Sequence, residues 1–244
     1  MKPYRFDPEK LRPIEYLNEV DPRNTYFARI DPKKGISIPI SLQDHHNDIS
    51  AYLLHKGVPT TISTHFETTK NLYLYSWIIY RFYPVAENHA YTCLEFALRE
   101  RFAEQLAKEE PKRYSKMAPT LHPLLKYAVR HKHIKNEDFE AWQAAINTRA
   151  RIRHQREKLQ ELIDKKLDFI SYDDEDFIIT EEDKNWDFVG ILMETVPKAR
   201  NNYSHGSSDL HNFALNTIRV VSEIINAIYS DPEKIRNDFK DKNE

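Results

Sequence analysis

The amino-acid sequence predicts an all-α protein, and three observations support that fold class. Only 4 glycines occur among 244 residues, whereas β-sandwiches and barrels need many tight turns. Apolar residues make up 40% of the chain, which is enough to build a core at this length. Apolar side chains also recur at helical spacing, most regularly over residues 209–229.

Residues 1–60 are expected to form a proline-rich extension with one short helix. Six prolines fall within residues 1–40, and because proline fixes φ and lacks an N–H, no long helix is expected there. The alternating residues 36–40 predict a short edge strand. Ser41 is then expected to cap a helix that reaches about His55.

Residues 61–244 are expected to fold as one helical bundle. A helix is predicted from about Thr64 to Phe82, and its second half is apolar on nearly all sides, which places it centrally. Pro84 is expected to end or kink that helix. The helix at about 136–167 is rich in charge and is expected to project, so region 110–180 is interpreted as a charged helical insertion. The remaining helices are predicted at about 85–108, 121–132, 184–205 and 209–229.

Capping residues predict where the last two helices begin. Thr180 and Asp183 resemble a capping box, with Asp in place of the usual Glu or Gln, and are expected to open the next helix. Pro197 predicts a kink or a restart within that helix. Ser207 and Ser208 are expected to cap the final helix.

Cys93 is the single cysteine, so no disulfide can form within the chain, and this points to a reducing compartment. It lies on the apolar stripe of its predicted helix, which favours a packed thiol over a nucleophile. Neither a signal-peptide pattern nor a run of 18 apolar residues is found. The sequence therefore predicts a soluble, cytoplasmic protein that does not cross a membrane.

Charge is distributed unevenly, although the net charge is only −2. Residues 99–166 hold 17 Lys and Arg against 10 Asp and Glu, and residues 167–187 hold 9 Asp and Glu with one lysine. The simpler interpretation is a solvated helix face followed by an acidic loop. The alternative is a basic surface for RNA, partly covered by that loop, with Arg149, Arg151 and Arg153 on the phosphates. Composition does not decide between them.

The most informative stretch runs from Lys198 to Gly206, at the junction of two predicted helices. Arg200 is followed at once by the polar Asn201 and, after four intervening residues, by His205. This pattern resembles the motif of nucleases in the HEPN superfamily (higher eukaryotes and prokaryotes nucleotide-binding). The resemblance covers residues 64–108 and 180–230. It implies a compact helical bundle and a homodimer in which two Arg–His motifs form one composite site.

A second stretch, Arg149 to His154, has the same spacing. There the arginine is followed by Ala150 instead of a polar residue, and the surrounding segment is highly charged. The stretch at Arg200 lies between strongly apolar elements, so it is the preferred motif.

Arg200 and His205 are residue types suited to RNA cleavage. RNA supplies its own nucleophile, the 2′-hydroxyl, so an enzyme needs only to move protons and stabilise phosphate charge. Histidine titrates near neutrality, and arginine donates paired hydrogen bonds to phosphate oxygens. Asn201 could bind the phosphate or fix the histidine, and Asn202 and Ser204 are grouped with it as supporting residues. No zinc-site spacing is present, and the chemistry predicts an endoribonuclease that needs neither a metal nor another cofactor.

Residues 89–101 resemble the early bundle helix of HEPN proteins, with an acidic residue among small and apolar ones. Glu95 could therefore face the site and orient Arg200. From the sequence alone, an ordinary surface or ion-pair glutamate is the preferred interpretation.

The expected partners are RNA, a second copy of the chain, and an antitoxin or other regulatory partner. The last follows from the resemblance, because many bacterial relatives are toxins or phage-defence effectors. Two other functions stay open: a non-catalytic HEPN module that binds RNA or nucleotide or assembles a complex, and a helical scaffold with an accidental motif. The intact Arg200–His205 pair favours the nuclease, whereas an accidental pair would point to open solvent.

Overall fold

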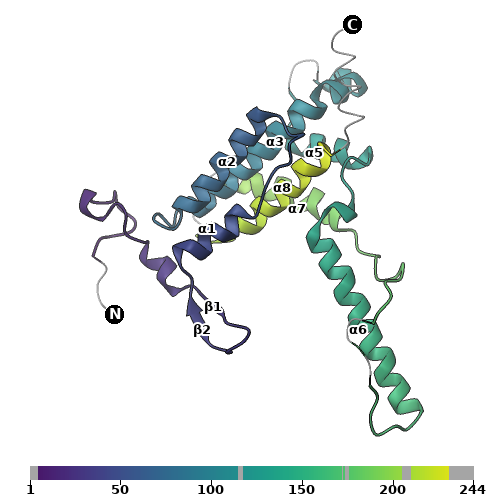
Figure 1. The fold of residues 1–244 in the computed structure, drawn as a ribbon. Helices are drawn as coiled ribbons and strands as arrows, with labels where there is room; N and C mark the ends of the chain where they lie inside the picture. The colour runs from purple at the N-terminus through teal and green to yellow at the C-terminus, as the bar shows by residue number, and fades with distance from the viewer. Residues whose placement is uncertain (1–4, 115–117, 172, 174–175, 205–209, 231–244) are drawn as a thin grey trace.

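The computed structural model describes residues 5–114, 118–171, 173, 176–204 and 210–230, and for residues 203 and 204 only the backbone. Helices make up 62% of the chain, and the sheet found within these ranges has two strands (Figure 1). The predicted all-α class is therefore confirmed.

A small hairpin precedes the long helices. It follows two short 3-10 helices, η1 (Ile14–Tyr16) and η2 (Pro22–Tyr26). β1 (Ala28–Ile30) pairs antiparallel with β2 (Ser37–Pro39). Gly35 lies between them with φ +64°, a left-handed conformation that glycine adopts readily. The strand predicted at 36–40 is confirmed, whereas the sequence pattern does not predict its partner.

α1 (Leu42–Ser50) begins where the sequence predicts. The Ser41 hydroxyl accepts from the Asp44 N–H at 3.2 Å, and the Asp44 carboxylate accepts from the Ser41 N–H at 2.9 Å. This reciprocal pair is a capping box. The helix ends at Ser50, so its predicted extension to His55 is wrong.

α2 (Thr60–Tyr75) is shorter than predicted, because the chain turns at residues 76–81. The Asn24 side-chain amide donates to the carbonyls of Ser76 and Trp77, each at 2.9 Å. Those carbonyls would accept from the next helical turn if the helix continued. Asn24, far away in sequence, therefore donates to these carbonyls in place of helical N–H groups. The prediction of one helix to residue 82 is wrong.

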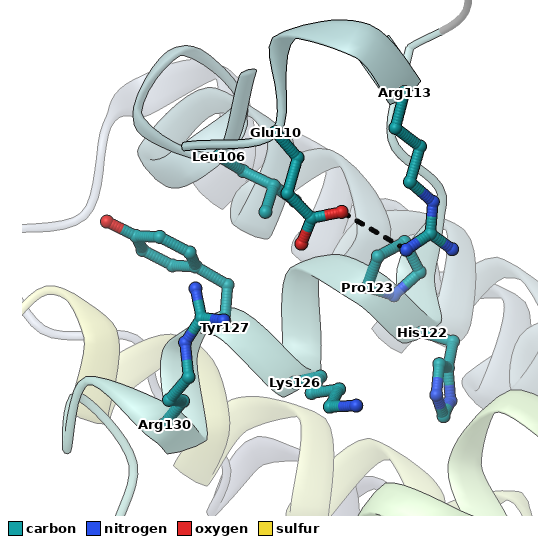
Figure 2. A pocket seen from close by; sticks show the side chains of 8 residues that line it. All are labelled: Leu106, Glu110, Arg113, His122, Pro123, Lys126, Tyr127 and Arg130. Carbon is teal, nitrogen blue, oxygen red and sulfur yellow. Dashed lines mark hydrogen bonds and ion pairs between the residues drawn. The ribbon is translucent and has the colours of Figure 1, made fainter. Parts of the chain in front are cut away.

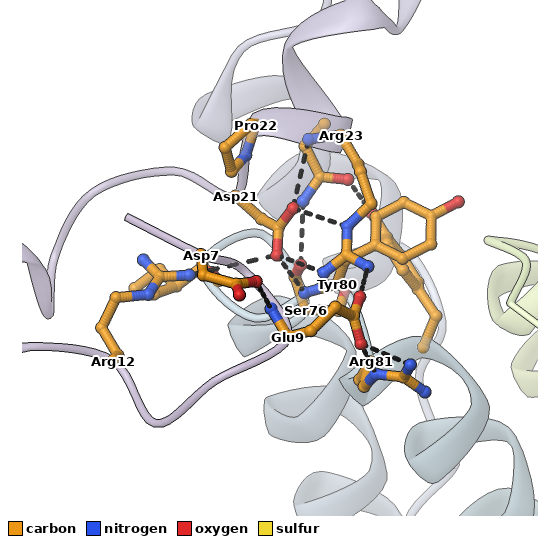
Figure 3. Close-up of polar contacts among 12 residues, drawn as sticks. Asp7, Glu9, Arg12, Asp21, Pro22, Arg23, Ser76, Tyr80 and Arg81 are labelled. Carbon is orange, nitrogen blue, oxygen red and sulfur yellow. Dashed lines mark hydrogen bonds and ion pairs between the residues drawn. The ribbon is translucent and has the colours of Figure 1, made fainter. Parts of the chain in front are cut away.

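A buried ionic cluster fixes the N-terminal extension to this turn (Figure 3). Asp21 is fully buried and accepts from the Tyr80 N–H at 3.1 Å and from Arg23 Nη2 at 2.8 Å. Arg12 Nη2 donates to the Ile78 carbonyl at 2.6 Å. Burial opposes ionisation of Asp21, but the hydrogen bonds from Arg23 and Tyr80 outweigh it and hold the Asp21 pKa below its ordinary value. The extension is thus packed onto the helices.

α3 (Phe82–Glu109) is the central helix and contacts α2, α5, α7 and α8 (Figure 1). Pro84 lies in its first turn, where a backbone N–H has no helical partner, so it does not end the preceding helix as predicted. Cys93 is fully buried, as its place on the apolar stripe predicts. The other elements of the bundle are α4 (Pro111–Tyr114), α5 (Leu121–Arg130), α7 (Phe188–Ser204) and α8 (Ala214–Ile228).

α6 (Glu140–Asp164) projects from the bundle, as its charge predicts, and follows the short η3 (Asn136–Asp138) (Figure 1). Its buried residues all lie in the first half of the helix: Trp142, Ile146 and Ala150. At the start of the far half, Arg153 contacts Ile178 and Asp183 in the acidic segment that follows the helix in sequence.

The starts of the last two helices differ from the predictions. Thr180 and Asp183 do form reciprocal hydrogen bonds, but α7 begins only at Phe188. Pro197 lies inside α7 and the helix continues through it without a restart. α8 begins at Ala214, and the predicted caps at 207 and 208 lie outside the described residues. None of the described helices combines the length and the apolar character that a bilayer crossing requires.

Candidate functional site

The end of α7 brings Arg200 against α3. Arg200 Nη2 lies 3.1 Å from Glu95 Oε2, and the Glu95 side chain is 9% exposed while that of Arg200 is 33% exposed. A carboxylate so deeply buried requires a cationic partner. The contact that the sequence left open between Glu95 and Arg200 is present.

Arg99 is a further cation at this site. Its Nη2 lies 2.5 Å from Glu95 Oε1, so the carboxylate of Glu95 sits between two guanidinium groups. Arg99 Nε is buried and has no hydrogen-bond partner in the described part of the chain. Two arginines share one carboxylate, which leaves an excess of one positive charge. Such a pair of planar donor groups suits a phosphate.

The sequence interpretation missed Arg99. A signal was present, because Glu95 and Arg99 are four residues apart and face the same side of a helix. Read alone, that spacing predicts an ordinary surface ion pair. The contact between Arg200, on α7, and the same Glu95 carboxylate distinguishes this pair from an ordinary one.

A second buried carboxylate lies two helical turns earlier on the same face of α3. Glu87 Oε1 accepts from Thr217 Oγ1 at 2.7 Å and from the Tyr91 hydroxyl at 3.4 Å, and Glu87 Oε2 lies 3.7 Å from His211 Nε2. Burial raises the pKa of Tyr91 to about 12, so its hydroxyl stays a donor. This polar cluster connects α3 to the start of α8.

A hollow of about 180 Å³ is lined mainly by residues of α7 and α8. Tyr91, which lies midway between Glu87 and Glu95 on α3, is among its lining residues. The volume is below the range of roughly 300–1,000 Å³ typical of pockets for drug-sized ligands. Its remaining lining comes from two helix faces: Leu192, Thr195, Val196 and Ala199 on α7, and Asn216, Thr217, Val220 and Val221 on α8.

The other predicted site residues are placed only in part. Asn201 is exposed and its Oδ1 accepts from Arg200 Nη1 at 3.4 Å, and Asn202 is also exposed. His205 lies outside the described residues, as does the side chain of Ser204. The geometry between the two motif residues is therefore not part of the described structure.

The arginines predicted to bind RNA have partners within the chain. Arg149 Nη1 donates to the carbonyls of Asp183 and Asn185, at 3.3 and 3.0 Å. Arg153 Nη2 lies 2.9 Å from the Asp183 carboxylate, and that hydrogen bond helps to hold the pKa of Asp183 well below its usual range. Arg151 lies over the Phe177 ring at 5.8 Å. The acidic segment thus covers part of the basic face of α6, and RNA contact by these arginines stays a prediction.

In the ranges that the structure describes, no three His, Cys, Asp or Glu side chains are grouped to hold a metal ion. His45 is buried and its Nε2 hydrogen-bonds the Tyr73 carbonyl at 2.9 Å. Burial raises the pKa of the Cys93 thiol to about 12, which suits a packing role.

No family model, curated protein or solved structure matches this chain. Its function is therefore inferred from these residues and their geometry.

Proposed function

We propose that this protein is a metal-independent endoribonuclease of the HEPN class, with Arg200 and His205 as its catalytic pair. The observation that carries the proposal is the contact between Arg200 and the buried Glu95. An accidental motif would leave Arg200 in open solvent. Instead, a carboxylate from another helix holds its guanidinium at the surface, one-third exposed.

In this proposal the RNA supplies the nucleophile. A histidine takes the proton of the 2′-hydroxyl, whose oxygen attacks the adjacent phosphorus. The bond from phosphorus to the 5′-oxygen breaks, and that oxygen receives a proton from a second acid. The products are a 2′,3′-cyclic phosphate and a 5′-hydroxyl, and no water is consumed. Arg200 donates to the non-bridging oxygens, where negative charge builds up.

Glu95 acts as a positioning residue in this scheme. It holds Arg200 by one oxygen and Arg99 by the other, which orients the guanidinium donors before RNA binds. The excess positive charge of the trio favours a phosphate over a neutral ligand. Asn201, next to Arg200, supplies a further polar group for the phosphate or for His205.

A homodimer would supply the separate acid and base. One motif offers a single histidine, whereas a two-fold axis beside the end of α7 brings two histidines and two arginines together. A two-fold contact is self-complementary, so one patch must serve both chains. Exposed apolar side chains on α7 and just before α8 could form it, among them Ile191, Leu210 and Phe213.

The test is incubation of the purified protein with total RNA in excess chelator. The proposal expects cleavage by the wild type and a loss of about two to four orders of magnitude in Arg200→Ala and His205→Ala. Arg149→Ala serves as a control for the second motif. RNA binding without cleavage by the wild type would favour the non-catalytic module, and dead Arg149 variants would select the other motif.

A further inference from the structure

A cavity of about 130 Å³ lies at the C-terminal end of α3, lined by residues from α3, α4 and α5 (Figure 2). Its floor is apolar and includes the buried Leu106 and Tyr127. Its walls carry four basic side chains (Arg113, His122, Lys126 and Arg130) and one carboxylate, that of Glu110. Leu106 follows Glu95 by 11 positions on α3, which is about 16 Å along the helix axis, so the cavity is separate from the site at Arg200.

Three basic side chains lie in a row on α5. His122, Lys126 and Arg130 are each four residues apart, so they share one helix face, and all three line the cavity. Arg113 reaches the same cavity from α4. Like charges at this spacing repel one another and destabilise a helix. An anion between them would offset that repulsion.

Both arginines of the cavity already have carboxylate partners. Arg113 Nη1 lies 3.2 Å from Glu110 Oε2, and Arg130 is paired with Glu109. His122 and Lys126 have no ion pair or hydrogen bond with any part of the chain that the structure describes. Figure 2 shows the side chains of Arg113, His122 and Lys126 gathered on one side of the cavity. This side therefore combines an uncompensated charge on Lys126 with several N–H donors.

We infer that this cavity is a binding site for a phosphate group, held by Lys126, His122 and Arg113. A volume of about 130 Å³ leaves room for a phosphate group between these side chains. Lysine binds phosphate as a compact charge, and arginine adds directed hydrogen bonds. The phosphate could belong to a nucleic-acid backbone or to a free mononucleotide. The site does not depend on the proposed nuclease activity.

The inference is tested by titrating the full chain with inorganic phosphate and with a single-stranded DNA oligonucleotide. DNA lacks the 2′-hydroxyl, so the proposed chemistry cannot consume it. Affinity is measured by calorimetry, and the imidazole C–H resonances of His122 report on the cavity itself. Lys126→Gln removes the uncompensated charge, Lys126→Arg restores it, and Lys112→Gln is the matched control, since Lys112 lies on α4 and does not line the cavity.

The inference expects phosphate to shift the His122 resonances in the wild type. Lys126→Gln should weaken phosphate binding about tenfold or more, while Lys126→Arg and Lys112→Gln stay within about twofold. A matching loss for the oligonucleotide, with competition by phosphate, identifies a backbone phosphate. A loss for inorganic phosphate, with no change for the oligonucleotide, identifies a free phosphate group, such as that of a mononucleotide, and excludes a backbone phosphate. Equal affinity of the wild type and Lys126→Gln, or unshifted His122 resonances at saturation, would overturn the site.

Discussion

Replacement of Glu95 by glutamine is the change that separates a positioning role from an ordinary ion pair. The substitution keeps the shape of the side chain and removes the charge that two guanidinium groups share. Each hydrogen bond between charged groups contributes about 1.5–3 kcal/mol when it is buried. The side chains of Arg99 and Arg200 are 39% and 33% exposed, so solvent screening reduces that contribution. We expect a loss of about 1–2 kcal/mol in the free energy of unfolding.

The effect on catalysis should be larger than the effect on stability. Without Glu95, Arg200 is free to move by an ångström or more, and a misplacement of that size costs about 10²-fold in rate. The fall should appear in kcat, with a smaller change in KM, because alignment matters most in the transition state. Single-turnover cleavage of an oligoribonucleotide gives the rate, and thermal unfolding gives the stability.

Glu104→Gln is the matched control for Glu95→Gln. Glu104 lies on the same helix and pairs with Lys108 at the same four-residue spacing, 2.9 Å apart, but both side chains are well exposed. This control should cleave like the wild type. If Glu95→Gln also cleaves like the wild type while its melting temperature falls, Glu95 serves stability alone and the positioning role is refuted.

Three further predictions concern the N-terminal cluster, the basic helix and the dimer. Asp21→Asn should lower the free energy of unfolding by about 2 kcal/mol at neutral pH. The pKa of Asp21 is lower in the folded state, so its stabilisation is full above the unfolded pKa of about 4. That stabilisation is lost as pH falls through the folded pKa, and the difference from the wild type should then vanish. Unfolding curves at several pH values check this, and a pH-independent difference contradicts it. Charge reversal at the exposed Arg151 should raise the RNA concentration needed for half-maximal cleavage and leave the saturated rate similar, while affinity falls steeply with salt. A salt-independent affinity would leave α6 as a solvated face. Mixing Arg200→Ala with His205→Ala subunits should restore partial activity if the site is composite, whereas full activity of a stable monomer would refute the dimer.

Local patterns predict much of the fold. The cap at Ser41, the buried thiol of Cys93 and the projecting helix α6 all follow from residues close together in sequence. The turn after Tyr75 does not, because its carbonyls are bound by Asn24, about fifty residues upstream. Likewise, Thr180 and Asp183 form the predicted hydrogen bonds, but the Asp183 carboxylate also binds Arg153, and no helix starts there.

The candidate site is predictable to a similar degree. The motif pattern singles out Arg200, whereas at Glu95 the sequence alone favours an ordinary surface or ion-pair glutamate and leaves contact with Arg200 open. The sequence does not predict the role of Arg99 or the basic cavity at α5, because both are formed by side chains from separate helices. Spacing within one helix shows which residues share a face, but it does not show what packs against that face.

Analysis of the ends produced from one defined oligoribonucleotide in excess chelator tests the central claim most directly. If Arg200 and His205 catalyse attack by the 2′-hydroxyl, the products carry a 2′,3′-cyclic phosphate and a 5′-hydroxyl. A single 2′-deoxy substitution at the cleaved position should then abolish cutting there. Products with a 3′-hydroxyl and a 5′-phosphate, or undiminished cutting of the 2′-deoxy substrate, would contradict the mechanism.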